Sequence, residues 1–126
     1  MSVKKMLHAV LFAALLPSAG QAGEVARTAT GWQLAGTLGL MQFIVVPEAS
    51  ARDQAYYESI IAEVCADQTA SCFLRFFTNG TGAALTFPLP DAVIAEPTVM
   101  FQRSAKHLRE QFQWSCRLQI SGSACF

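Results

Sequence analysis

Four cysteines in two close pairs limit the fold of this chain more than any other residues. Six residues separate Cys65 from Cys72, and eight separate Cys116 from Cys125. A zinc site favours Cys-x-x-Cys or Cys/His spacing, and a thioredoxin-type redox pair needs two cysteines two residues apart. Neither pattern is present, so the sequence predicts disulfides and no metal site. No other motif predicts a cofactor.

The pairing of the cysteines is a separate question, because four cysteines allow three connectivities. Cys65 and Cys72 bracket the segment ADQTAS, and Cys116 and Cys125 bracket RLQISGSA. Both segments suit turns, which favours the two local pairs. By the loop-entropy model, a disulfide that closes so short a loop contributes roughly 2–3 kcal/mol. We therefore expect two local disulfides to staple the fold.

The N-terminal segment 1–22 has the features of a secretory signal peptide in their usual order. Two lysines near the start precede an apolar run, Ala9–Leu16, and a proline and small residues follow it. We expect cleavage between Ala22 and Gly23, with a cut after Ala19 as the alternative. The apolar run is much shorter than the roughly 20 residues that span a bilayer. The sequence thus predicts a periplasmic or extracellular protein, with no transmembrane segment in the mature chain.

Cleavage leaves 104 residues, the size of one ordinary domain. Residues 23–35 are predicted to be a polar lead-in, with mobility left open, and residues 36–126 a single globular domain. Because Lys4 and Lys5 leave with the signal peptide, seven basic side chains remain against nine acidic ones. This balance gives no general attraction for nucleic acid.

A strand and then a helix are predicted after the lead-in. The segment Leu40–Val46 is rich in β-branched and aromatic side chains and ends at a proline, as a strand buried on both faces does. Ser50 suits the cap of a helix, and Asp53 suits its first turn. Apolar residues at helical spacing then predict one buried face, made of Tyr57, Ile60, Ile61 and Val64.

Cys72–Thr78 is the second predicted strand, and the glycine-containing turn 79–82 follows it. A strand, a helix and a strand in this order form a β-α-β unit with parallel strands. The predicted fold class is therefore α/β or α+β. We expect a small single domain with a β-α-β core, a further broken helix and a C-terminal strand, stapled by the disulfides.

The segment 91–108 has two interpretations. Asp91 after Pro90 starts a helical pattern, but Pro97 interrupts it at a cost of about 3 kcal/mol. Alternation in TVMFQRS, residues 98–104, favours a strand instead. We expect a kinked or broken helix, with the strand as the alternative.

The C-terminal segment 111–120 alternates strictly between polar and apolar residues, which predicts a strand with one buried face. Trp114 is then a core residue rather than a platform for a ligand. The residues predicted to face the core are Phe112, Trp114, Cys116, Leu118 and Ile120.

No set of catalytic residues is assembled in the sequence. His107 has no acid or nucleophile beside it that would orient it as a general base. The sequence therefore favours a protein that is not an enzyme. The alternative is a small exported enzyme with a site assembled around His107 from distant residues such as Asp91 and Glu110.

Candidate binding residues lie in the same region. Arg103, Lys106 and Arg109 recur at every third position and form a cationic stripe if this segment is helical. Such a stripe is either a solvated face or a docking patch for an acidic protein or an anionic envelope component. Tyr56 is predicted to be exposed, either as an aromatic contact for a partner or as an ordinary surface residue. We therefore expect a small exported protein that binds another macromolecule or an envelope component, in an oligomeric state that the sequence leaves open.

Overall fold

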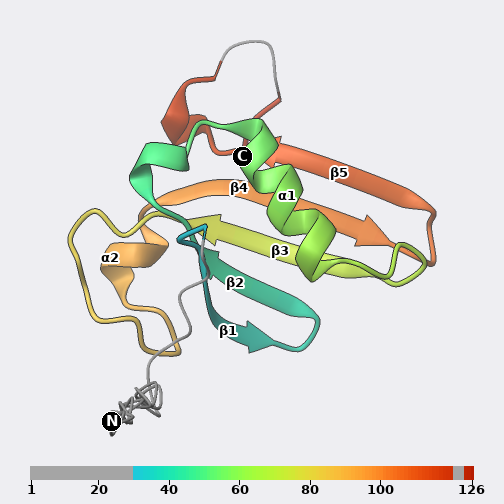
Figure 1. The fold of residues 1–126 in the computed structure, drawn as a ribbon, viewed down its shortest axis with the longest axis horizontal. Helices are drawn as coiled ribbons and strands as arrows, with labels where there is room; N and C mark the ends of the chain where they lie inside the picture. The colour runs from blue at the N-terminus through green and yellow to red at the C-terminus, as the bar shows by residue number, and fades with distance from the viewer. Residues whose placement is uncertain (1–29, 121–123) are drawn as a thin grey trace, which may run out of the picture.

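A five-stranded mixed sheet with one long helix on one face forms the centre of the molecule (Figure 1). The computed structural model describes residues 30–120 and 124–126, so the predicted signal peptide 1–22 lies outside the described residues. The strands lie side by side in the order in which they occur in the chain. The elements are β1 (Gln33–Leu38), β2 (Met41–Val45), η1 (Glu48–Ser50), α1 (Gln54–Val64), β3 (Cys72–Phe77), α2 (Asp91–Ile94), β4 (Pro97–Ser104), β5 (Arg109–Trp114) and η2 (Cys116–Leu118).

Strands β1 and β2 form a hairpin at one edge of the sheet. Leu38 pairs with Met41, which leaves a two-residue turn. Gly39 occupies its first position with φ of 60°, a conformation that glycine adopts at little cost. Strand β1 begins at Gln33, inside the segment predicted to be the polar lead-in 23–35.

Helix α1 follows β2 and precedes β3, and these two strands are parallel neighbours. The predicted strand 40–46 and the predicted strand 72–78 match β2 and β3 closely. Asp53 caps the helix by accepting a hydrogen bond from the backbone N–H of Tyr56 at 3.4 Å. The expected cap, Ser50, lies instead in the short η1 turn. Thus the helix is confirmed, but it begins one turn later than its first possible cap.

The main core lies between α1 and the sheet, and Tyr57 is at its centre. Its ring meets those of Phe76 and Trp114 edge to face, with centroids 5.0 and 5.5 Å away. Its hydroxyl donates to the carbonyl of Ala51 at 2.7 Å, so the buried polar atom is satisfied. Ile60 and Ile61 are also buried, as helical spacing predicts. Trp114 is 5% exposed and is a core residue, as predicted.

A smaller core covers part of the opposite face of the sheet. Val93 of α2 and Leu89 pack there against Val45 and Phe77. The helix lies beyond one end of the sheet, so this cover reaches only part of the face (Figure 1).

The prediction of a broken helix over 91–108 is wrong. Helix α2 ends at Ile94, and the chain continues as β4, which pairs with both β3 and β5. Pro97 is the first residue of β4, a strand position where a missing N–H is tolerated. Pairing with both neighbouring strands provides partners for the backbone N–H and C=O groups of this segment. A helix interrupted by proline would leave some of these groups without a partner. The alternative strand over 98–104 is therefore correct.

The predicted C-terminal strand is correct only as far as Trp114, where β5 ends. The chain then forms the η2 turn, and Gln119 adopts a left-handed conformation with φ of 53°. Cys116 is exposed rather than directed into the core, which corrects the prediction. The physical reason is that the chain turns back here, and Cys125 forms a parallel bridge with Trp114.

Two disulfides close the loops that the sequence singled out. Cys65 pairs with Cys72 across Cα atoms 5.9 Å apart, and Cys116 pairs with Cys125 across 4.9 Å. The first joins the end of α1 to the start of β3, and both of its cysteines are buried. The second holds the returning tail against the end of β5. The predicted local pairing is confirmed.

The burial of Tyr57 predicts a loss of stability at alkaline pH. Burial raises the pKa of its hydroxyl from 10.0 to about 12, so the unfolded chain releases this proton at lower pH than the folded one. The contribution of Tyr57 to the free energy of unfolding is therefore fully present below pH 10. It falls as the pH rises from 10 towards 12, by about 2–3 kcal/mol in total. We expect Tyr57→Phe to remove most of this fall, while costing about 1 kcal/mol at pH 8 through the lost hydrogen bond.

Urea unfolding of both proteins at pH 8, 9, 10 and 11, followed by tryptophan fluorescence, measures these slopes. An equally steep decline in the variant and the wild type would contradict the role of Tyr57.

Candidate functional site

The candidate site is the part of the sheet surface that faces away from α1 and is not covered by the smaller core. We call this surface the open face. Side chains alternate along each strand, and paired residues of neighbouring strands share a face. Leu74 and Phe101, which are paired, belong to the main core, so Phe73 and its partner Gln102 point the other way. By the same register, the open face consists of Met41, Phe73, Arg75, Met100, Gln102, Ser104, Arg109, Gln111 and Gln113.

A shallow hollow of about 530 Å³ lies at one end of the open face and continues onto the β4–β5 turn. Phe73 contributes an aromatic surface to it. His107 reaches it from the turn, where its backbone N–H donates to the hydroxyl of Ser104 at 3.3 Å. The hollow is lined by Phe73, Gln102, Ser104, His107, Arg109 and Gln111, and none of these residues is acidic.

Two arginines give the open face its charge. Arg75 and Arg109 are both exposed, and the one ion pair found within residues 30–120 and 124–126 involves neither of them. The guanidinium of Arg75 donates to the sulfur of Met100 at 4.0 Å. No residue of the open face is acidic. The face can therefore accept an anion without first breaking an internal ion pair.

Glutamines supply most of the remaining polar groups. Gln102 and Gln111 are paired across β4 and β5, and Gln113 pairs with Met100 on the same face. A glutamine amide both donates and accepts hydrogen bonds. Together with the arginines and Phe73, these groups can bind a ligand that carries anionic and hydroxyl groups and presents an apolar surface.

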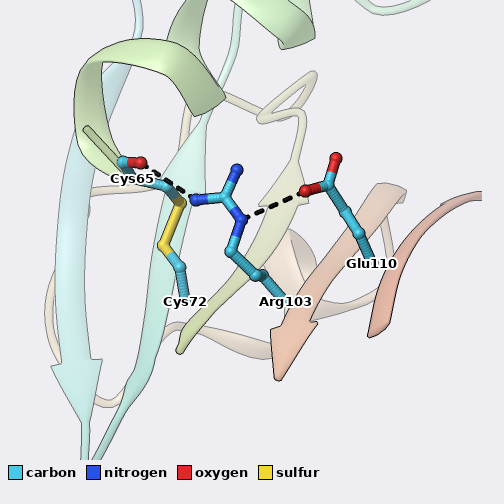
Figure 2. The surroundings of a disulfide bond; sticks show 4 residues. All are labelled: Cys65, Cys72, Arg103 and Glu110. Carbon is cyan, nitrogen blue, oxygen red and sulfur yellow. Dashed lines mark hydrogen bonds and ion pairs between the residues drawn. A yellow bond between two sulfur atoms is a disulfide. The ribbon is translucent and has the colours of Figure 1, made fainter. Parts of the chain in front are cut away.

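Arg103, by contrast, is bound within the fold (Figure 2). Its Nη1 donates to the carbonyl of Cys65 at 3.0 Å, and its Nε pairs with the carboxylate of Glu110 at 3.1 Å. The guanidinium also lies 5.4 Å from the ring centroid of Phe101. Its side chain is only 13% exposed. Arg103 therefore connects the disulfide at the end of α1 to the β4–β5 hairpin.

The structure does not bring the four predicted docking residues together. Arg103 and Arg109 lie on paired strands and face opposite sides of the sheet, while Lys106 lies in the turn between them. No helical stripe exists, because this segment is a hairpin. Tyr56 is half-buried, and its hydroxyl donates to the carbonyl of Thr30 at 2.7 Å. Partial burial raises the pKa of Tyr56.

The three residues of the alternative enzyme site are also apart. His107 lines the hollow, whereas Glu110 points to the α1 side and pairs with Arg103. Asp91 begins α2, near the opposite end of the sheet. These positions give His107 neither of the two proposed carboxylates as a partner.

Neither a metal-binding cluster nor a membrane-spanning helix is present in the described part of the chain, residues 30–120 and 124–126. Three or more histidine, cysteine, aspartate or glutamate side chains do not gather there in a way that could hold a metal ion. Nor does that part contain a helix with the length and apolar character needed to cross a membrane.

Comparisons of the chain with protein-family models, curated proteins and solved structures gave no significant match. The proposed function therefore rests on the chemistry of the chain's own residues.

Most residues of the open face were not singled out from the sequence. The alternation in 111–120 marked the glutamines as pointing away from the core, but it did not show that they share one face of the sheet with Gln102 and Arg75. Only the pairing of β4 with both β3 and β5 gathers these residues. The one usable signal was the absence of acidic residues at the outward-facing positions of these strands.

The two arginines of the β4–β5 hairpin are expected to differ in their effect on stability. Arg103→Ala removes two polar contacts of a mostly buried guanidinium, so the free energy of unfolding falls by about 1–2 kcal/mol. Arg109→Ala removes an exposed side chain and changes it by less than about 0.5 kcal/mol. Urea unfolding at pH 7 compares the two variants. Equal losses would show that Arg103 does not connect these elements as described.

Proposed function

We propose that this protein is exported and that its open face binds an anionic macromolecule, such as a component of the cell envelope, without catalysis. The fold that presents this face is built on a β-α-β core of β2, α1 and β3. One observation carries the proposal. Arg75 and Arg109 are exposed on a sheet face with no acidic side chain, beside a hollow that contains Phe73.

The shape of the site favours a chain-like ligand over a small molecule. Sites for small molecules are usually concave and enclose most of the ligand. Here the hollow is open to solvent and borders the outward-facing side chains of β3, β4 and β5. A polymer lying across the strands would contact both arginines at once, and the glutamine amides would bind its hydroxyl or amide groups.

Export is supported by the disulfides and by the N-terminal sequence. Disulfides form and persist in oxidising compartments such as the periplasm and the extracellular medium. Both disulfides join cysteines close in sequence, and no described cysteine is free. The proposed location is therefore the periplasm or the medium, after cleavage of residues 1–22.

The competing proposal is a small exported enzyme that uses His107, because this residue lines the hollow. A histidine base normally needs a partner that orients its ring. The lining offers only a serine, two glutamines, an arginine and a phenylalanine beside it. This composition supports binding more than catalysis.

Binding to soluble polymers tests the open face. We expect the mature protein to bind polygalacturonate, dextran sulfate or polyphosphate at low ionic strength, more weakly as salt is added. The double variant Arg75→Gln/Arg109→Gln should bind at least about tenfold more weakly, because two charge-assisted contacts are lost. Isothermal titration calorimetry measures both affinities.

Two controls accompany this titration. Lys106→Gln removes a positive charge from the neighbouring turn and should change affinity much less, and neutral dextran should not bind. The proposal fails if none of the three anionic polymers binds, or if Lys106→Gln weakens binding as much as the double variant.

Export and the oxidised state are tested by intact mass. Protein recovered from the periplasm or medium of an expressing bacterium should lack residues 1–22. It should take up no alkylating agent until reductant is added, because all four cysteines are paired. A retained N-terminal segment, or thiols that react before reduction, would contradict export into an oxidising compartment.

A further inference from the structure

Three leucines project into solvent from two turns of the sheet. Leu38 and Leu40 flank the glycine of the β1–β2 turn and are 69% and 68% exposed, and Leu108, in the β4–β5 turn, is 93% exposed. Both turns lie at the same end of the sheet, on the right in Figure 1. We call these three residues the leucine tips. Three large apolar side chains exposed at the same end of the sheet, in turns at its two edges, favour a contact with another apolar surface.

The backbone conformation of Leu108, like its exposure, gives no reason for a leucine at this position in terms of the stability of the fold. Its φ is 50°, in the left-handed region that leucine rarely adopts and that asparagine or glycine adopts readily. A strained residue is usually offset by burial, but this side chain is almost fully exposed. The leucine at this position therefore contributes little to folding, and a role outside the fold accounts for it.

Cationic side chains flank the most exposed tip. Lys106 lies two residues before Leu108, and Arg109 follows it directly. Neither turn contains an acidic residue, whether within 38–41 or within 105–109. Lysine and arginine can keep their charges among lipid headgroups while a neighbouring leucine enters the acyl region. Anionic headgroups attract such a segment further.

The positions of the two turns also restrict the shape of the partner. The β1–β2 turn belongs to one edge of the sheet and the β4–β5 turn to the other, with β3 between them. A partner that touches both turns at once must be broad and flat at this end. A lipid surface has that shape and offers both an apolar interior and negative charge.

We infer that the leucine tips, with Lys106 and Arg109, dock the protein on the surface of an anionic lipid membrane. The contact is peripheral, because only side chains of the two turns enter the lipid. The contact shares Arg109 with the proposed polymer site, and Leu38 pairs with Met41 at the edge of the open face. Leu108, which the experiment below replaces, lies in the β4–β5 turn and is not part of the open face.

Co-sedimentation with vesicles tests this inference. Wild-type protein should sediment with vesicles of phosphatidylglycerol and phosphatidylcholine, and much less with vesicles of phosphatidylcholine alone. Leu108→Asn should reduce binding to the anionic vesicles by about tenfold, because a leucine no longer enters the lipid. The same variant should melt at the same temperature or higher, because asparagine tolerates this backbone conformation.

Ile94→Asn is the matched control. Ile94 is 52% exposed on α2, at the opposite end of the sheet, so this variant should bind vesicles like the wild type. The inference is overturned if wild-type protein fails to bind anionic vesicles, or if Ile94→Asn loses as much binding as Leu108→Asn. It is also overturned if sedimentation velocity shows that the wild type self-associates and that Leu108→Asn is monomeric, which would assign the leucines to a second copy.

Discussion

The packing of Tyr57 against the sheet is the interaction on which the rest of the structure depends. Its ring meets Phe76 of β3 and Trp114 of β5, and its hydroxyl is bound by the carbonyl of Ala51. Through this one residue, α1 is fixed across strands that are distant in sequence. The Cys65–Cys72 disulfide and Arg103 then secure the far end of the helix. The helix can therefore occupy only one face of the sheet.

Because α1 covers only one face of the sheet, the second face is either covered by other segments of the chain or exposed to solvent. Here α2 and the loop before it cover the region around Val45 and Phe77. Beyond that region the exposed side chains include arginines and glutamines, which tolerate water. The same outward positions lack acidic residues, so the face is cationic although the sequence as a whole contains as many acidic as basic residues. An uneven distribution of charge of this kind steers anionic partners to one surface.

The sequence predicted the parts of the fold that depend on local patterns. Strands β2 and β3, the buried face of α1 and both disulfides follow from periodicity, caps and cysteine spacing. The prediction of a broken helix was wrong at β4, because it treated Pro97 as an interruption of a helix and not as the first residue of a strand. The predicted C-terminal strand also extended β5 past Trp114, since alternation cannot show where a disulfide turns the chain back. The candidate site was largely missed, because strand pairing, not sequence proximity, gathers Arg75, Gln102 and Gln111.

Binding at the open face is tested most directly by an NMR titration of the isotope-labelled protein with the anionic polymer that binds it most tightly. If the polymer binds there, chemical shifts change along β3, β4 and β5 and at the side-chain amides of Gln102, Gln111 and Gln113. Residues of α1 that point to solvent, such as Glu58, should change little. Shifts confined to the α1 side of the molecule, with the three glutamine amides unmoved, would contradict the account.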